Sequence, residues 1–269
     1  MEKVHFTKEK ATNLATLYGR ALDYRSANPI LGDKAADDAV RRIDFDFGKA
    51  GINRDIASVA LRAKPIDDWA AEYLREHPDA VVLHLGCGLD SRVYRLDPPP
   101  TVEWFDIDYP EVVDLRRRIY PERAHYTMIG SSVTDFAWLE QVPADRPALI
   151  VAEGLTMYLK PEQGSELLRR LVAKFPSGEL ICDVFSTFAI RLQKLNPVVR
   201  KAKATLYWGI DDPHEFERYG LTLLSSLDAS HWVTPDVMAR LRPITRLQMK
   251  ALKYIPKMAK MAWIVRCRF

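Results

Sequence analysis

Two glycines and two carboxylates follow short apolar runs of the chain, in an order typical of a nucleoside-binding site. Gly86 and Gly88 come directly after the apolar run 81–85, and glycine lets a backbone turn tightly and approach a ligand. Asp108 ends the next apolar run, where a carboxylate in a wound α/β sheet accepts hydrogen bonds from ribose hydroxyls. Glu153 follows the apolar run 148–152, where a desolvated charge needs partners or access to a cleft.

The glycine pattern is not that of a dinucleotide site. Ser91 stands where a third glycine would open the helix, and the long side chain of Arg92 follows it. A pyrophosphate would therefore lose its usual place at a helix N-terminus. A ligand with a ribose and no phosphate fits better, and S-adenosylmethionine is the common ligand of this kind. The alternative that the glycines form only a tight turn stays open.

The composition is that of an ordinary globular protein. The chain has 269 residues, 48% of them hydrophobic and 28% charged, and its net charge of +3 is too small to indicate nucleic acid or membrane as a partner. The basic run Arg116–Arg118 is expected on a solvated helix face. Cys87, Cys182 and Cys267 lie far apart without metal-ligand spacing, so we expect reduced thiols, no metal and a cytoplasmic location. Neither a signal peptide nor an apolar run of membrane-spanning length is expected.

Helical spacing of apolar residues dominates the chain before the first strand. It runs over residues 7–25, with Thr7 as N-cap, then around positions 40 and 43, and over 53–75, where Lys64-Pro65 predicts a break. We expect these helices to cover the site rather than to build the sheet.

Strands and helices then alternate, which predicts an α/β fold with a parallel sheet and helices on both faces. Expected strands are 81–85, 102–108, 125–129, 148–152 and 179–185, with helices at 110–119, 135–139 and 161–174. The last third is expected to hold helices at 196–207, at 212–219 and from 234, and strands at 221–226 and 261–267. Residues 1–269 then form one expected domain, with a helical cap (1–78), a cofactor-binding core (79–190) and an acceptor-side region (191–269).

Ligands of such sheets lie across the carboxyl ends of the strands, so the residues at those ends are the informative ones. They are Gly86, Gly88, Asp106, Asp108, Ser131, Ser132, Glu153 and Asp183. Asp108 either meets the ribose or caps the helix that begins at Tyr109-Pro110. Asp106 is expected to face the other way and is the weaker candidate for the ribose.

Three motifs in a fixed order are more specific than any one of them. The segments 85–92 (LGCGLDSR), 105–110 (FDIDYP) and 153–159 (EGLTMYL) resemble the leucine carboxyl methyltransferase family. Within that family the sequence is most similar to the bacterial branch of tetracenomycin-type polyketide O-methyltransferases, which residues 16–21 (TLYGRA) and 28–31 (NPIL) also resemble.

The resemblance implies a class I S-adenosylmethionine methyltransferase fold, which is Rossmann-like, with a seven-stranded, mostly parallel sheet and an N-terminal helical cap. It implies S-adenosylmethionine as the methyl donor. By motif, the segment Gly86, Cys87 and Gly88 would underlie the methionine and ribose portions of this cofactor. Asp108 would take the ribose hydroxyls, and Glu153 would lie near the methionine amine.

Two further cofactor residues come from the resemblance alone. Arg62, on the helix before the first strand, would pair with the methionine carboxylate. At the adenine the family has an aspartate followed by leucine, where this chain has Ser132 and Val133. A serine hydroxyl would still meet the adenine amine, but without a charge-assisted hydrogen bond.

Methyl transfer to oxygen is an in-line displacement, so the protein mainly aligns the reacting groups and excludes water. A carboxylate acceptor is already ionised at neutral pH, whereas a phenol, with a pKa of about 10, is helped by a base or a nearby cation. Candidates for the acceptor side are Tyr158, Arg25 and His214, with His231, Tyr18, Tyr24 and Tyr207 as further residues of its pocket.

We therefore expect an S-adenosylmethionine-dependent O-methyltransferase whose small-molecule acceptor is aromatic or polyketide-like, with a carboxyl oxygen favoured over a phenol. Two alternatives stay open. One is a NAD-dependent oxidoreductase on a similar sheet, and the other is a nucleotide-binding regulatory protein that has lost the chemistry. Neither nucleic acid nor membrane is expected as a partner.

Overall fold

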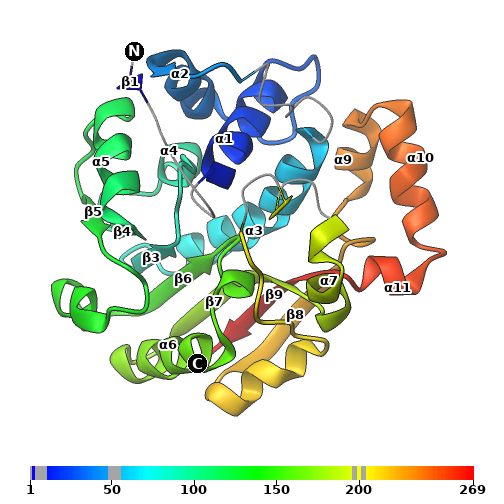
Figure 1. Cartoon of the computed structure of the whole chain (residues 1–269). Helices are drawn as coiled ribbons and strands as arrows, with labels where there is room; N and C mark the ends of the chain where they lie inside the picture. Colours follow the sequence, from blue (N-terminus) through cyan, green and yellow to red (C-terminus); the bar gives the residue numbers. More distant parts are fainter. Residues whose placement is uncertain (1, 4–10, 48–55, 196–198, 201–203) are drawn as a thin grey trace.

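The computed structural model describes residues 2–3, 11–47, 56–195, 199–200 and 204–269 of the chain. A seven-stranded sheet in the order β5-β4-β3-β6-β7-β9-β8 crosses the middle of the molecule (Figure 1). Strands β3 to β7 pair in parallel, and β9 is antiparallel to both of its neighbours. The bounds are β3 Val81–Leu85, β4 Glu103–Asp108, β5 Tyr126–Gly130, β6 Ala148–Ala152, β7 Gly178–Phe185, β8 Thr222–Asp228 and β9 Ala262–Arg268.

The expected seven-stranded, mostly parallel sheet is confirmed. Strands β3 and β6 begin and end where the sequence predicts them, and the others are displaced by one or two residues. The strand order reverses at β3, which has β4 and β5 on one side and β6 and β7 on the other. Such a reversal leaves a crevice outside the carboxyl ends of the two central strands, and the predicted site residues follow these strands.

Helices cover both faces of the sheet, because successive strand residues point to opposite sides. Leu83 and Leu167 belong to the core under α6, whereas Val82 and Ile66 belong to the core under α3. The α-helices between residues 11 and 191 are α1 Ala11–Tyr24, α2 Lys34–Arg42, α3 Ile56–Glu76, α4 Arg92–Leu96, α5 Pro110–Ile119, α6 Pro161–Lys174 and α7 Thr187–Arg191. The 3-10 helices are η2 Phe136–Gln141, η3 Thr156–Tyr158, η4 Gln193–Leu195 and η5 Pro213–Tyr219.

A separate core joins the N-terminal helices to α5. Leu17 of α1, Val40 of α2 and Leu115 of α5 are buried together in it. The first expected helix is observed from Ala11, and its predicted cap, Thr7, lies outside the described residues. Ile43 does not continue α2, because it begins the two-residue strand β2 (Ile43–Asp44), which pairs with β1 (Glu2–Lys3).

The predicted break at Lys64-Pro65 is wrong. Helix α3 continues through Pro65 to Glu76, although a proline inside a helix removes one backbone hydrogen bond. Leu61 and Ile66, on either side of the proline, are buried in two different apolar cores. Packing on both sides therefore outweighs the local cost of the proline.

Three helices lie between β8 and β9: α9 Pro235–Arg240, α10 Pro243–Leu252 and α11 Pro256–Ala259, drawn in orange and red in Figure 1. Of these, the sequence predicts only α9. The helix expected over 196–207 is wrong for 204–207, where the side-chain amide of Gln193 bonds both backbone groups of Leu206. Among the described helices, none has the length and apolar character needed to cross a membrane.

Gly178, the first residue of β7, has no space for a side chain. A Cβ atom there would stand 2.2 Å from the carbonyl oxygen of Ala148 and 2.6 Å from the ring of Phe269. Gly178→Ala should therefore lower the free energy of unfolding by about 1–3 kcal/mol, because backbone must move. Urea denaturation measures the change. The exposed neighbour Ser177 provides the control, since Ser177→Ala should stay within about 0.5 kcal/mol of the wild type. Equal stability of the two variants would refute the close contact.

Candidate functional site

The chain makes a tight glycine turn after β3, and α1 lies directly against this turn. Gly86 and Gly88 have φ angles of +60° and +52°, in the left-handed region that favours glycine. The N–H of Gly88 donates to Oδ2 of Asp108 at 2.7 Å, which ties the turn to the end of β4. A Cβ on Gly88 would stand 2.7 Å from Oδ1 of Asn13 in α1. The predicted tight turn is therefore present, and its approach to a ligand stays a prediction.

Asp108 is positioned at the carboxyl end of β4 by two backbone donors. Besides Gly88, the N–H of Tyr109 donates to its Oδ1 at 2.7 Å. Burial raises the pKa of Asp108 above its ordinary value, against the effect of these two hydrogen bonds. Each of its carboxylate oxygens accepts one of these hydrogen bonds and retains a second lone pair, which leaves acceptor capacity for hydroxyl groups.

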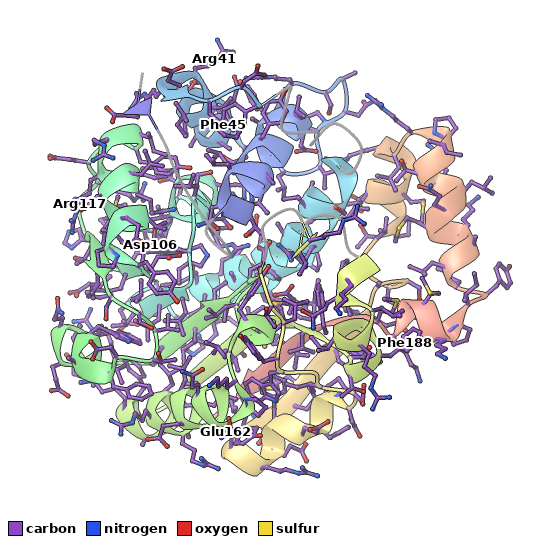
Figure 2. The ribbon with its side chains drawn as sticks, viewed as in Figure 1. Arg41, Phe45, Asp106, Arg117, Glu162 and Phe188 are labelled. Atoms are coloured by element: carbon purple, nitrogen blue, oxygen red, sulfur yellow. The ribbon has the colours of Figure 1, made fainter. Side chains whose placement is uncertain are left out.

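Arg116 supports the glycine turn from below, and its expected place on a solvated face is wrong. Its guanidinium is fully buried and donates to the carbonyl oxygens of Gly88 and Asp90 at 2.9 and 2.7 Å, as well as to Asp106. Arg117, by contrast, is 55% exposed and lies at the rim of the molecule in Figure 2. The helical spacing could have indicated this burial, because Arg116 lies four residues after buried Val112 and therefore on the same face of α5.

Asp106, labelled in Figure 2, is a buried carboxylate of β4. It accepts hydrogen bonds from Trp104 Nε1 at 2.8 Å and from Arg116, and His84 Nδ1 lies 3.2 Å away. Burial opposes its ionisation, but Arg116 outweighs this and holds the pKa of Asp106 below its ordinary value. Its acceptor positions are used inside the protein, in keeping with its expected weaker candidacy for the ribose.

Glu153 lies among three guanidinium groups. Arg20 of α1 donates to Oε1 at 3.3 Å, Arg62 of α3 donates to the same oxygen at 3.1 Å, and Arg92 of α4 donates to Oε2. Burial opposes ionisation here as well, but Arg62, Arg92 and Arg20 together lower the pKa of Glu153 to about 2. The carboxylate is therefore charged and fixed in orientation at neutral pH.

These residues belong to a larger group that we call the buried charge cluster. Arg95 joins it by donating to Asp67 at 2.6 Å and to Asp90 at 3.1 Å, and Asp90 accepts from Arg20 at 2.9 Å. The cluster consists of Arg20, Arg62, Arg92, Arg95, Asp33, Asp67, Asp90, Glu153 and Asp183. Its five carboxylates outnumber its four guanidiniums by one.

Arg62 is the one guanidinium of the cluster with substantial solvent exposure, at 20% of its side chain. Its Nε donates to Glu153 and its Nη1 donates to Asp183 at 3.1 Å. A guanidinium has five N–H groups, so Arg62 retains donors for an anionic group arriving from the crevice. Sequence patterns alone did not single out Arg62, and its predicted role came from the resemblance.

Arg20 and Arg92 were missed as site residues. Arg92 appeared in the sequence only as an obstacle to a pyrophosphate, whereas the structure turns it fully inward onto Glu153 and Asp67. Arg20 is also buried, and its Nε finds no hydrogen-bond partner among the described residues. Arg92 also lies close to its chain neighbours His84 and Asp90. The other carboxylates that these two arginines bind are 25 to 133 positions away, and no local pattern indicates those contacts.

The predicted adenine residues take two different positions. Val133 is 7% exposed and packs in the core under α6. Ser132 is half-buried after β5, and its Oγ lies 2.9 Å from Oγ1 of Thr134. Cys87 is buried between the two glycines, and burial raises the pKa of its thiol well above the ordinary value. Contact of these residues with adenine stays a prediction.

Of the three acceptor-side candidates, one lies next to the site. Tyr158 is half-buried in η3, five residues after Glu153, and packs against Met157. Arg25 pairs with Asp37 of α2, and His214 is 64% exposed with Nδ1 3.1 Å from Glu217 of the same 3-10 helix. Among the described residues, neither Arg25 nor His214 forms an ion pair with a member of the buried charge cluster.

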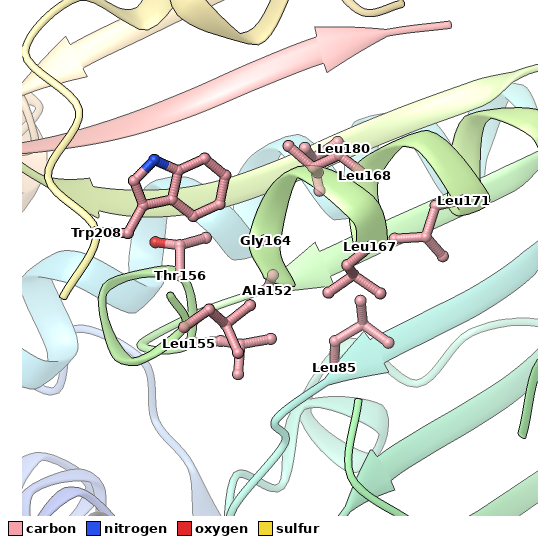
Figure 3. Close-up of a pocket in the computed structure, with 11 residues that line it drawn as sticks. Leu85, Ala152, Leu155, Thr156, Gly164, Leu167, Leu168, Leu171, Leu180 and Trp208 are labelled. Carbon is pink, nitrogen blue, oxygen red and sulfur yellow. The ribbon is translucent and has the colours of Figure 1, made fainter. Parts of the chain in front are cut away.

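A small apolar cavity lies beside the site but does not belong to it. It is enclosed between α6, η3 and Trp208, as Figure 3 shows, and its volume is about 20 Å³. That volume holds about one water molecule, and apolar walls give a water no partners. We interpret it as a packing gap. It is lined by Leu85, Ala152, Leu155, Thr156, Leu159, Gly164, Leu167, Leu168, Leu171, Leu180 and Trp208.

Glu153→Gln should destabilise the fold by about 3–5 kcal/mol at pH 7, because it leaves buried guanidiniums without their shared counter-charge. The pKa of Glu153 is lowered from 4.5 to about 2, so its charge contributes fully above pH 4.5. As the pH falls from 4.5 toward 2 this contribution is lost, and the two proteins should converge in stability.

Denaturant unfolding at several pH values between 3 and 7 measures this convergence. The exposed carboxylate Glu162 gives the control, since Glu162→Gln should match the wild type throughout. A constant difference between wild type and Glu153→Gln down to pH 3 would argue against a depressed pKa.

The sequence of the chain matches a known family over its cap and most of its core. Residues 13–172 match the model described as "Leucine carboxyl methyltransferase". The chain is 48% identical over 217 residues to the "Tetracenomycin polyketide synthesis O-methyltransferase TcmP" of Streptomyces glaucescens, covering 80% of each protein. It is 35% identical over 240 residues to the "S-adenosyl-L-methionine-dependent methyltransferase dpfgK" of Gibberella zeae, covering 81% of this chain and 80% of that protein.

Solved structures share the fold. The mycolic acid cyclopropane synthase CmaA1, solved with S-adenosylhomocysteine (SAH) and CTAB, has a TM-score of 0.52 at 12% identity, covering 98% of this chain and 99% of its own. The N-methyltransferase NodS from Bradyrhizobium japonicum WM9 has a TM-score of 0.50 at 14% identity, covering 77% of this chain and 96% of its own. The expected class I methyltransferase fold is confirmed.

Proposed function

The chain belongs to the leucine carboxyl methyltransferase family and is an S-adenosylmethionine-dependent O-methyltransferase, and from this premise we propose that its acceptor is a carboxyl oxygen of a small aromatic or polyketide-like molecule. The main observation behind the proposal is that Glu153 is ionised and bound by three guanidinium groups. The name of the relative from Streptomyces glaucescens, a tetracenomycin polyketide synthesis O-methyltransferase, supports the polyketide class.

The charge balance of the site supports this cofactor. S-adenosylmethionine carries an amine cation and a sulfonium against one carboxylate, so it brings one net positive charge. The buried charge cluster has one more carboxylate than guanidiniums, and burial raises the pKa of its member Asp183, so a positively charged ligand would favour the ionised form of these carboxylates. A dinucleotide, with its two phosphate charges, would add to the negative excess instead.

Individual residues of the chain fit the parts of the cofactor. Arg62 retains N–H groups for the methionine carboxylate, and Glu153 would face the amine. The turn at Gly86 and Gly88 holds the end of β3 next to Asp108, to which the ribose hydroxyls would donate. When bound, the cofactor supplies a methyl group on a cationic sulfur. The task of the chain is to fix that sulfur and the acceptor oxygen in line, and to exclude water.

The residues at the site favour a carboxylate acceptor over a phenol. Glu153, with a pKa of about 2, is far too weak a base to take a proton from a phenol, whose pKa is about 10. The pKa of Asp90 is also held well below its ordinary value, by Arg20 and then by Arg92 and Arg95, against the effect of burial. An acceptor that is already ionised at neutral pH needs no base. We infer that Tyr158 lies on the acceptor side of the site.

Neither alternative finds support. The relatives are named as methyltransferases, and none of the similar proteins reported above is named as an oxidoreductase or a regulatory protein. The three cysteines are free and buried, and we infer reduced thiols and a cytoplasmic setting. We also infer that cap, core and C-terminal region act as one domain on a small molecule, without nucleic acid.

Titration calorimetry tests the cofactor. The wild type should bind S-adenosylmethionine and S-adenosylhomocysteine and ignore NAD, and Asp108→Ala should weaken binding by at least about tenfold, or 1.4 kcal/mol. Asp114→Ala, which removes an exposed carboxylate from α5, should bind as the wild type does. Wild-type protein that binds neither sulfur ligand would refute the cofactor assignment.

The pH dependence of turnover tests the acceptor. With a carboxylate acceptor, kcat should stay level between about pH 6 and pH 8, because the oxygen is ionised throughout that range. A rate that rises with pH toward about 10 would favour a phenol instead. Mild alkali separates the two products, since it hydrolyses a methyl ester and leaves an aryl methyl ether intact.

A further inference from the structure

Large apolar side chains gather on the outer side of the α10–α11 region. The described residues include eight exposed large hydrophobic side chains, and five of them fall between residues 244 and 258. Ile244 and Leu247 are 62% and 63% exposed, and Tyr254 is 86% exposed. Helix α10 has no buried residue at all, and it stands at the edge of the molecule in Figure 1. The apolar group is therefore directed at solvent.

The arrangement on α10 is the reverse of that on an ordinary surface helix. Residues 244, 247 and 251 are spaced by three and four, so they share one face, and that face is exposed. The face toward the protein carries Met249, which packs beside α9, and Arg246, which donates to the carbonyl oxygen of Ala239 at 2.9 Å. An apolar face turned away from the protein marks a contact surface for something else.

The same segment is strongly basic. Six lysines and arginines and no acidic residue lie between residues 242 and 260, so this stretch carries +6 and the rest of the chain −3. Lys250, Lys253 and Lys260 are exposed, and no ion pair with a described carboxylate is formed by them. The small net charge of the whole chain conceals this local excess.

We propose that α10, α11 and the turn between them form a docking surface for an anionic lipid bilayer. The apolar face, with Ile244, Leu247 and Tyr254, would enter the headgroup region, and the lysines would meet the anionic lipids. Charge complementarity selects this occupant, because a second copy of the chain would bring two strongly positive segments together. The surface is independent of the cofactor site, and it revises the expectation of no membrane partner.

Flotation of the full chain with lipid vesicles tests the proposal. Binding is expected to phosphatidylcholine vesicles that contain about 30% phosphatidylglycerol, to be weak on pure phosphatidylcholine, and to fall in about 0.5 M salt. The double variants Ile244→Ser/Leu247→Ser and Lys250→Glu/Lys253→Glu should each reduce binding by at least about tenfold. Their affinity for S-adenosylmethionine should be unchanged, which separates this surface from the cofactor site.

Matched substitutions elsewhere serve as controls. Leu224→Ser removes an exposed leucine from β8, and Arg117→Glu/Arg118→Glu reverses two exposed charges on α5. Both should bind vesicles as the wild type does. No flotation with anionic vesicles, or equal loss in the controls, would overturn the proposal. Sedimentation analysis gives a second way to overturn it. If the wild type is a dimer that Ile244→Ser/Leu247→Ser dissociates and the control substitutions do not, the apolar face is an interface between two copies of the chain.

Discussion

The cost of burying charge governs how this protein is assembled. An ionised group removed from water is tolerated only when opposite charges and hydrogen bonds surround it. The buried charge cluster meets this condition by drawing on α1, the segment before α2, α3, α4 and the ends of β6 and β7. Cap and sheet are therefore held by the same ion pairs, and the cap cannot shift without exposing unpaired charge.

This dependence explains why the side chains of the proposed cofactor site are held in place before a ligand binds. Glu153 is held from three directions, so its orientation does not have to be set when a cation arrives. Arg116 does the same for the glycine turn by holding two of its carbonyl oxygens. Groups that are fixed before binding lose little freedom on binding, which is the source of preorganised recognition.

The sequence predicted what local patterns encode and missed what distant contacts create. Strands β3 and β6 are continuous apolar runs, so their limits could be predicted, and predicted site residues follow directly after them. The predictions of a helix break at Pro65 and of a solvated Arg116 were wrong, because packing against distant parts of the chain outweighs the local pattern at both residues. Arg62 required a family resemblance, since its contacts with Glu153 and Asp183, 91 and 121 residues away, distinguish it from a solvated arginine.

The position of β9 fixes the order in which the sheet can be completed. β9 is the last strand in the chain, yet it lies between β7 and β8 and is the hydrogen-bonded neighbour of both. While the chain is being synthesised, β3 to β7 can pair as they emerge, but β8 has no place until residues 262–268 exist. Until then the edge of β7 that β9 later covers is open, and an unpaired strand edge exposes backbone N–H and C=O groups to pairing with other chains.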